Sequence, residues 1–340
     1  MTEYAGMTVE FIIQNFQFLN FTMKIIITGG AGFIGSHLVK KITDRGDQVI
    51  VIDNFNDYYD PQLKRDRISI FLKDCPIKLY EKDICDFEEM EKIFQEEKPD
   101  KIIHLAAMAG VRNSFKNPFL YEKVNVQGTL NLLELSVKYK LKNFVLASSS
   151  SVYGANKKFP FSEDDKVDTP LSPYASTKKA AELMAHVYHS AFSLKVTILR
   201  YFTVYGPWGR PDMSYFKFTK NIFADQPIEV YNSGEMWRSF TYINDAVSGT
   251  IKALDADLEY AILNVGNNAK EKLTDFIDVL EQNIGKKAER KLQVVQRGDV
   301  LKTEADISKL KAMGWQPATG TKEGLQKFVE WYREYYKIQK

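Results

Sequence analysis

The chain has 340 residues, of which 44% are hydrophobic and 26% charged, and its formal net charge is +2. This composition is typical of a globular protein with a sizeable core, and the even spread of the basic residues excludes the charged patch of a nucleic-acid-binding protein. No run reaches the roughly 20 apolar residues of a membrane span, and Cys75 and Cys85 lack metal or redox spacing, so we expect a cytoplasmic protein without membrane or nucleic-acid partners.

The first strand pattern begins at residue 24, and we interpret residues 1–23 as an N-terminal extension. Residues 9–22 are apolar but interrupted by polar side chains, and they lack the basic start and the small-residue cleavage site of a signal peptide. A helix that binds a membrane surface or a partner is the alternative interpretation.

Apolar runs alternate with helical patterns from residue 24 to about residue 204. The runs predict strands over residues 24–28, 48–52, 77–80, 101–105, 143–147 and 196–199. The stretches between them predict helices over residues 36–44, 86–97, 117–139 and 172–190. Strands that alternate with helices indicate an α/β protein with a doubly wound, Rossmann-type parallel sheet covered on both faces.

The pattern loosens after about residue 205. Helices are predicted near residues 214–224, 244–255, 273–282 and 321–338, with a strand near residues 228–231. We therefore expect two parts: residues 24–204 form the sheet domain, to which later segments return, and residues 205–340 form mainly a smaller α/β lobe. This lobe is expected at the carboxyl edge of the sheet, where open α/β sheets bind their ligands.

Three glycines, Gly29, Gly32 and Gly35, follow the first strand and open the first helix. They permit a tight turn, the close approach of a pyrophosphate and the packing of helix on strand. Asp53 ends the second strand 18 residues after Gly35, where a carboxylate binds a ribose hydroxyl pair and repels a 2′-phosphate. Because no cation follows before Lys64, the sequence predicts NAD rather than NADP as cofactor. A plain glycine turn beside a solvated carboxylate is the alternative.

The ends of the other strands supply the rest of the predicted NAD site. Asp83 ends the third strand and is placed to accept a hydrogen bond from the adenine amino group, with a surface carboxylate as the alternative. The further residues predicted to contact NAD are Phe33, Ile34, Asn54, Ile84, Leu105, Ala106, Ala107, Ala109, Asn125, Tyr201 and Val204. The four histidines have no metal spacing, so no metal site is predicted.

Tyr174 and Lys178 lie four residues apart in a helical pattern, so they share one helix face. A free tyrosine, with a pKa of about 10, is a poor base at pH 7, but a nearby ammonium and the positive nicotinamide ring favour the phenolate and lower that pKa. Pro173 suits the first turn of this helix. A serine among residues 148–151, after the fifth strand, is placed to donate to a substrate oxygen; a polar loop cap is the alternative.

The segments TGGAGFIGSH, HLAA, SSSSVYG and PYASTK together resemble the extended short-chain dehydrogenases that act on nucleotide sugars. The resemblance covers roughly residues 24–336. It implies that Ser149, four positions before Tyr153, is the catalytic serine and that Tyr174 and Lys178 are the catalytic pair. The alternative from another class is an NAD-binding regulator without catalysis, against which these intact residues argue.

Three longer segments narrow the resemblance. FNDYYDPQLKRDR (residues 55–67), AGVR (residues 109–112) and RYFTVYGPWGRPDM (residues 200–213) resemble the UDP-glucuronate 4-epimerases. Those enzymes interconvert UDP-glucuronate and UDP-galacturonate through a transient 4-keto sugar. Met108 departs from that family, which more often has glutamine there, and we expect the change to affect packing beside the nicotinamide rather than the reaction.

The same 4-keto intermediate also leads to decarboxylases and dehydratases of this family. The decarboxylases carry a glutamate just after the catalytic residue and the dehydratases carry Asp-Glu, whereas this chain has Ser150 and Ser151. The resemblance therefore favours epimerisation. A UDP-glucose or UDP-N-acetylglucosamine 4-epimerase and a UDP-glucuronate decarboxylase are the alternatives.

A uronate epimerase must keep the substrate carboxylate away from the geometry that favours loss of carbon dioxide. Residues expected to hold it are Arg112, Ser150, Thr203 and Arg210. An arginine fork matches a carboxylate, although a surface or diphosphate-facing cation is the alternative for both arginines.

The resemblance also implies contacts with the rest of the UDP-sugar. The residues expected there are Ser149, Val230, Tyr231, Arg238, Gln296 and Asp299. At Gln296 this chain departs from many relatives, which have arginine at that position. Relatives also dimerise through helices like those predicted over residues 117–139 and 172–190, so we expect a homodimer.

Overall fold

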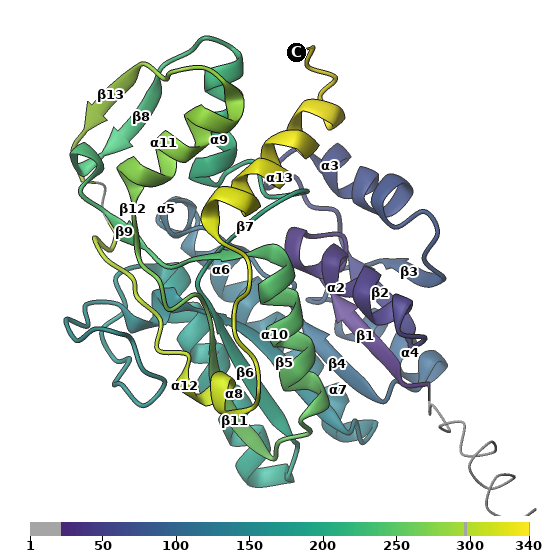
Figure 1. Ribbon diagram of the computed structural model, residues 1–340. Helices are drawn as coiled ribbons and strands as arrows, with labels where there is room; N and C mark the ends of the chain where they lie inside the picture. Colours follow the sequence, from purple (N-terminus) through teal and green to yellow (C-terminus); the bar gives the residue numbers. More distant parts are fainter. Residues whose placement is uncertain (1–21, 296–297, 340) are drawn as a thin grey trace, which may run out of the picture.

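A seven-stranded parallel sheet forms the centre of the computed structural model, which describes residues 22–295 and 298–339. The strand order is β11-β6-β5-β4-β1-β2-β3 (Figure 1). The strands are β1 (Lys24–Thr28), β2 (Gln48–Asp53), β3 (Ile77–Glu81), β4 (Lys101–His104), β5 (Asn143–Ser149), β6 (Val196–Tyr201) and β11 (Tyr260–Val265). Every residue of β4, β5 and β6 is buried, as strands covered on both faces require. The predicted Rossmann-type α/β fold is confirmed.

Helices cover both faces of the sheet, because successive side chains of a strand point to opposite sides. Ile25 and Ile27 of β1 pack in one hydrophobic cluster with α2 and α10, whereas Ile26 packs in a second cluster with α4, α7 and α8. The bounds of these helices are α2 (Phe33–Asp44), α4 (Phe87–Glu97), α7 (Gly128–Lys138), α8 (Pro173–Phe192) and α10 (Ile243–Asp255). Each helix therefore presents one apolar face to the sheet.

The smaller lobe lies beyond β6 and consists of helices and two-stranded ladders (Figure 1). Its helices are α9 (Ser214–Phe223), α11 (Leu273–Ile284) and α13 (Thr321–Tyr335), whereas α12 (Ser308–Ala312) returns to the sheet and packs against β11. Its ladders pair β7 (Thr203–Tyr205) with β10 (Phe240–Tyr242), β8 (Ile228–Tyr231) with β13 (Arg290–Gln293), and β9 (Trp237–Arg238) with β12 (Glu271–Lys272).

Several elements differ from the sequence patterns. The predicted helix over residues 117–139 is divided into α6 (Pro118–Glu122), a π-helical turn (Lys123–Gln127) and α7. A short helix, α3 (Pro61–Asp66), and strand β11 were missed. α3 is too short and too polar to show an apolar stripe, and the first half of β11 is only half-buried. The remaining short elements are α5 (Val111–Ser114), a π-helical turn (Arg67–Phe71) and 3-10 turns (Ser150–Tyr153 and Asn232–Gly234).

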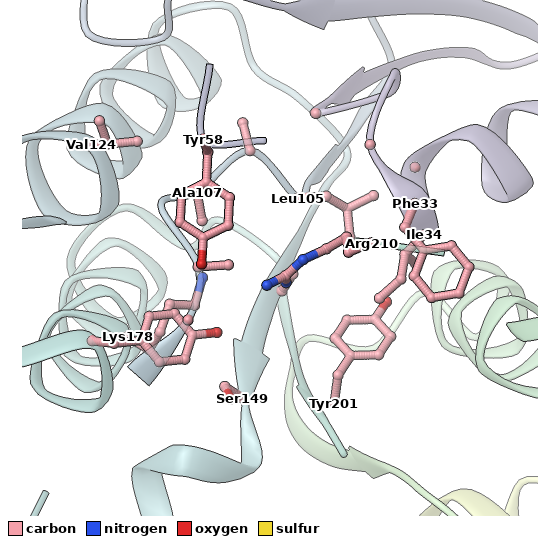
Figure 2. A pocket seen from close by; sticks show the side chains of 18 of the residues that line it. Phe33, Ile34, Tyr58, Leu105, Ala107, Val124, Ser149, Lys178, Tyr201 and Arg210 are labelled. Atoms are coloured by element: carbon pink, nitrogen blue, oxygen red, sulfur yellow. The ribbon is translucent and has the colours of Figure 1, made fainter. Parts of the chain in front are cut away.

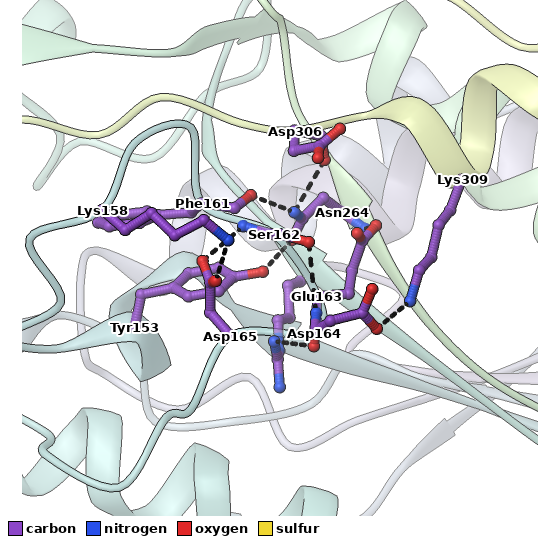
Figure 3. Close-up of polar contacts among 11 residues, drawn as sticks. Tyr153, Lys158, Phe161, Ser162, Glu163, Asp164, Asp165, Asn264, Asp306 and Lys309 are labelled. Carbon is purple, nitrogen blue, oxygen red and sulfur yellow. Dashed lines mark hydrogen bonds and ion pairs between the residues drawn. The ribbon is translucent and has the colours of Figure 1, made fainter.

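A polar network fixes the loop after β5 to the edge strand β11. Asn264 of β11 donates from Nδ2 to the carbonyl oxygens of Phe161 and Asp306, both at 2.9 Å (Figure 3). Its Oδ1 accepts from the Tyr153 hydroxyl at 2.7 Å, and its backbone N–H donates to Glu163 at 2.7 Å. Because Tyr153 belongs to the turn that directly follows β5, the network holds the carboxyl end of β5 in place.

Candidate active site

A cavity of about 420 Å³ opens at the carboxyl ends of the central strands (Figure 2). Its wall is formed by the glycine turn, the ends of β2, β4, β5 and β6, and the first turns of α8. The predicted site residues that line it are Gly29, Gly32, Phe33, Ile34, Gly35, Asp53, Asn54, Asp83, Ile84, Leu105, Ala106, Ala107, Ala109, Ser149, Ser150, Tyr174, Lys178, Tyr201, Thr203, Val204 and Arg210. Residues up to 181 positions apart in the sequence thus meet around one space.

The glycine turn has no room for side chains. Gly29 has a φ of +70°, and a Cβ atom on Gly35 would lie 2.1 Å from the Gly29 carbonyl oxygen. A Cβ atom on Gly32 would lie 2.9 Å from the same oxygen. No side chain caps α2 at Gly32, so the positive end of this helix faces the cavity. The turn is therefore shaped to receive a pyrophosphate.

Asp53 lies at the end of β2 in the cavity wall. Its carboxylate accepts hydrogen bonds from the backbone N–H groups of Ala31 at 3.2 Å and Phe55 at 2.9 Å. Burial raises the pKa of Asp53, although Lys64 and these hydrogen bonds act in the opposite direction. Beside it, Asn54 donates to Asp83 at 2.9 Å, so the two predicted adenosine-side residues form a pair.

Tyr174 and Lys178 project from the first turns of α8, whose N-terminus is capped by Ser172 with Pro173 in the first turn. A side-chain hydrogen bond from Ser149 reaches the Tyr174 hydroxyl. Ser149 in turn accepts from the backbone N–H of Ser151 at 3.2 Å. These two bonds place the serine hydroxyl and the phenol side by side at the end of β5.

The lowering of the Tyr174 pKa was expected from Lys178 together with the positive nicotinamide ring, and it stays a prediction. In the protein alone, burial raises the pKa of Tyr174, and the Ser149 hydrogen bond and the Arg210 charge only partly oppose this effect. Burial also lowers the pKa of Lys178 from 10.5 to about 8, with Glu182 acting in the opposite direction. Desolvation is therefore the largest cause of both shifts.

The cavity fits a dinucleotide by its shape and its donors. Lys178 is 4% exposed and lines the cavity, yet within residues 22–295 and 298–339 its ammonium has no hydrogen-bond or ion-pair partner. A buried cation without a partner is costly unless a ligand supplies acceptors. The residues present thus fit the predicted NAD site, because the crowded glycine turn suits a pyrophosphate, Asp53 suits a ribose hydroxyl pair and Lys178 suits ligand acceptors.

Arg210 lies at the substrate end of the cavity with Ser150 and Thr203. Its guanidinium forms an ion pair with Asp212, at 3.0 Å from Nε and 2.6 Å from Nη2. The Tyr58 hydroxyl donates to the same carboxylate at 3.1 Å. This end of the cavity therefore presents a guanidinium and two hydroxyl groups, which suit an anionic substituent.

A smaller hollow of about 130 Å³ adjoins the cavity and shares Ser150 and Thr203 with it. Arg238 and Asp299 line this hollow, as expected for the nucleotide end. Burial lowers the pKa of the Arg238 guanidinium to about 10, with Asp299 opposing the shift. The hollow is therefore a candidate diphosphate subsite.

Some predicted residues lie outside these cavity walls. Asn125 is buried behind the wall, where it exchanges hydrogen bonds with the backbone of Met108 at 2.8 and 3.0 Å. Val230 is buried in the core. Arg112 forms an ion pair with Asp299 at 2.9 Å, and its guanidinium lies over the Tyr231 ring. Gln296 lies outside the described residues.

The sequence patterns missed several residues of the site. Tyr58 and Lys64 line the cavity, although they come from the loop and helix that follow β2. Lys64 donates from Nζ to Asn56, to the carbonyl oxygen and to Oδ1, each at 2.9 Å. Asp212 stands behind Arg210. The segments FNDYYDPQLKRDR and GRPDM contain these residues and were the available signal.

The histidines that are most buried serve the core. His104 lies 2.7 Å from Thr28 and 3.0 Å from Thr129, and burial lowers its pKa to about 3. Burial likewise lowers the pKa of His37 to about 4. Among residues 22–295 and 298–339 there is no group of three or more histidine, cysteine or acidic side chains arranged to hold a metal. In the same residues, no helix combines the length and apolarity needed to cross a bilayer.

Comparison with protein families gives a match over residues 25–266 to the NAD dependent epimerase/dehydratase family. A UDP-glucuronate 4-epimerase of Thermodesulfobacterium geofontis is 46% identical over 311 residues, which cover 91% of this chain and 96% of that protein.

Solved structures agree with the sequence relatives. The UDP-glucuronic acid 4-epimerase of Bacillus cereus, in complex with UDP-glucuronic acid and NAD, superposes with a TM-score of 0.87 at 36% identity. The match covers 92% of this chain and 100% of that chain. The UDP-glucose 4-epimerase of Thermotoga maritima, with UDP-glucose, has a TM-score of 0.84 at 32% identity, over 92% of this chain and 100% of that one.

Proposed function

The chain belongs to the NAD dependent epimerase/dehydratase family, and we propose that it catalyses the reversible C4 epimerisation of UDP-glucuronate to UDP-galacturonate with bound NAD. One observation carries the proposal. The hydrogen-bonded Ser149 and Tyr174, the buried Lys178 and Arg210 line one cavity together with the glycine turn. A proton acceptor, a cofactor site and an anion-binding group are thus within one space.

Tyr174 moves the proton in this mechanism. The glycine turn, Asp53 and Lys178 would hold NAD, which would supply a reversible acceptor for the hydride of the sugar C4. Tyr174 accepts the proton of the C4 hydroxyl and later returns it, while Ser149 donates to the same oxygen. Burial disfavours the phenolate, and in our proposal Lys178, one helical turn away, supplies a positive charge that favours it.

Arg210, Thr203 and Ser150 hold the substrate carboxylate in our proposal. The 4-keto sugar is a β-keto acid, and it loses carbon dioxide when the bond from C5 to the carboxylate aligns with the carbonyl π system. Hydrogen bonds that hold the carboxylate away from this alignment protect it. The absence of an acidic side chain at Ser150 and Ser151 further favours epimerisation over the decarboxylase and dehydratase reactions.

The nucleotide is proposed to bind toward the smaller lobe. Arg238 and Asp299 in the hollow beside the cavity support this placement, and Arg112 and Tyr231 lie next to Asp299. Gln296 belongs to the same proposed segment. Residues 24–204 would then bind mainly NAD, and residues 205–340 mainly the UDP-sugar.

We also propose a cytoplasmic homodimer. Leu183, Met184 and Val187 form an exposed apolar stripe on α8, with 54%, 36% and 52% of their surfaces exposed. Such a stripe at helical spacing is suited to a matching helix of a second copy. The free thiols of Cys75 and Cys85 support a reducing compartment.

The test is a product assay with purified protein and no added reductant. We expect UDP-glucuronate to give a mixture with UDP-galacturonate, detected by chromatography with mass detection. UDP-pentose and carbon dioxide as the main products would instead identify a decarboxylase. Conversion of UDP-glucose or UDP-N-acetylglucosamine in preference to UDP-glucuronate would identify a neutral-sugar epimerase, and NAD binding without turnover of any of these sugars would identify a regulator.

A further inference from the structure

The Arg210 guanidinium is held from behind by a carboxylate that stands outside the cavity. Asp212 accepts from Nε at 3.0 Å and from Nη2 at 2.6 Å, so it occupies one forked edge of the guanidinium. Arg210 lines the cavity, whereas Asp212 is not among the lining residues. Burial acts to raise the pKa of Asp212, but the Arg210 charge and hydrogen bond hold it below its usual value, so the carboxylate stays ionised.

This contact decides which hydrogens of Arg210 remain for a ligand. A guanidinium carries five N–H groups in one plane, which form two forked edges. With the Nε/Nη2 edge taken by Asp212, both hydrogens of Nη1 and one of Nη2 remain. One hydrogen of Nη1 and the remaining hydrogen of Nη2 form the terminal edge, which matches the two oxygens of a carboxylate.

The Tyr58 side chain lies against both members of the Arg210–Asp212 ion pair and acts as its brace. Its hydroxyl donates to Asp212 Oδ2 at 3.1 Å, and its ring lies 5.8 Å from the Arg210 guanidinium carbon (Figure 2). Gly110, with a φ of +92°, makes room for this hydroxyl, because a Cβ atom there would lie 2.2 Å from it. Three segments distant in the sequence thus fix one carboxylate.

The loop that carries Arg210 is held independently by another arginine, Arg67. Arg67 is fully buried and donates from Nη2 to the carbonyl oxygens of Trp208 at 2.7 Å and Gly209 at 3.1 Å. Its Nη1 donates to Ala31 in the glycine turn at 3.1 Å. The loop backbone is therefore positioned by Arg67, and the remaining freedom lies in the Arg210 side chain that Asp212 holds.

We propose that Asp212 is a positioning residue that directs the terminal Nη1/Nη2 edge of Arg210 toward the carboxylate of a hexuronate substrate, with Tyr58 as its brace. The inference rests on the proposed function for the identity of the substrate. Asp212 sets the preference for UDP-glucuronate over UDP-glucose. The two substrates differ only at C6, which is a carboxylate in the first and a hydroxymethyl group in the second. Asp212 also keeps that carboxylate out of alignment with the 4-keto group during turnover.

The test compares binding of UDP-glucuronate and UDP-glucose to the NAD-loaded protein by calorimetry. The wild-type protein is expected to prefer UDP-glucuronate. In Asp212→Asn this preference should fall about tenfold, because a neutral amide holds the Arg210 guanidinium less firmly than the carboxylate does. The affinity for UDP-glucose should be unchanged. Tyr58→Phe, which keeps the ring and removes only the hydroxyl, should shift the preference in the same direction and remains informative if Asp212→Asn does not fold.

Asp255→Asn is the matched control, because it removes an Arg–Asp pair, with Arg45 at 2.9 Å, that lies away from the cavity. It should leave the preference unchanged. During turnover, Asp212→Asn should also release a larger share of UDP-pentose. Asp212→Asn and Tyr58→Phe proteins with the wild-type preference, or a wild-type protein with no preference, would overturn the inference. If the wild-type protein prefers UDP-glucuronate and Asp212→Asn weakens this preference, but the wild-type protein forms no epimer, the inference about Asp212 stands and the proposed function is rejected.

Discussion

Burial sets the protonation of the two central side chains, Tyr174 and Lys178. It raises the pKa of the phenol and lowers that of the ammonium to about 8, so both charged forms are disfavoured in the folded chain. Functional groups under such opposed shifts are frequent at active sites, where the bound ligands supply the missing charges. At the residue scale, the site is therefore incomplete without cofactor and substrate.

Tyr174→Phe removes the proton acceptor and leaves the ring in place. Turnover should fall by at least about 100-fold, the usual contribution of general acid–base catalysis. NAD should stay bound, because the phenyl ring still packs in the cavity wall. The measurements are product formation and the NAD released on denaturation; near-normal turnover would end the assignment of Tyr174.

Lys178→Met should stabilise the cofactor-free protein while it abolishes activity. The folded pKa of about 8 lies below the ordinary 10.5, so the folded state binds this proton less tightly than the unfolded state. The buried ammonium therefore lowers the free energy of unfolding by on the order of 3 kcal/mol at pH 7. This destabilisation is fully present below pH 8 and disappears as the pH rises from about 8 to 10.5.

Denaturant unfolding at several pH values checks this prediction. The advantage of Lys178→Met over wild type should be largest at pH 7 and should shrink toward pH 10.5. Equal stability of the two proteins at pH 7 would show that the ammonium is solvated rather than buried.

At the scale of elements, α8 orders the site because three of its residues share one face. Tyr174, Lys178 and Glu182 are spaced by four residues. The Glu182 carboxylate accepts hydrogen bonds from Nε and Nη2 of Arg200 on β6, at 2.9 and 2.8 Å. It also accepts one from the Ser148 hydroxyl on β5 at 2.6 Å. The helix is thus anchored to the two strands whose ends carry Ser149 and Tyr201.

Arg200→Met should destabilise the protein by roughly 3–5 kcal/mol, because among the described residues it leaves the buried Glu182 carboxylate with only the Lys179 ammonium, at 3.4 Å, as an ion-pair partner. The Arg200 and Glu182 side chains are only 1% exposed, so solvent does not compensate. The double variant Arg200→Met/Glu182→Met should recover part of the loss. Unfolding free energies of the single and double variants decide the point, and a single variant as stable as wild type would contradict it.

At the scale of the whole molecule, the exposed stripe on α8 is the surface that we propose for dimer formation. Leu183→Glu/Val187→Glu places two charges in this stripe and should convert a dimer to a monomer, measured by light scattering. Ile70→Glu, at another exposed apolar residue, is the control and should not change the mass. A monomeric wild-type protein would reject the homodimer.

The sequence by itself determined the parts of this protein that depend on local spacing. The glycine turn, the order of strands and helices up to residue 204, and the Tyr174–Lys178 pair all follow from patterns within a few residues, because sterics and helix periodicity act over short distances. Family resemblance added Ser149 and the uronate substrate. The local patterns predicted the helix of residues 117–139 as continuous and missed α3 and β11, which have weak apolar periodicity.

Only the tertiary structure decided which groups are desolvated and which distant segments meet. Burial, a property of the whole fold, is the largest cause of the Tyr174 pKa shift and acts against the lowering that Lys178 and the nicotinamide ring are expected to produce. Asp212, Tyr58 and Gly110 meet only after three loops are brought to one edge of the sheet. Spacing along the chain specifies none of these contacts, since each depends on packing between segments about 50 to 150 residues apart.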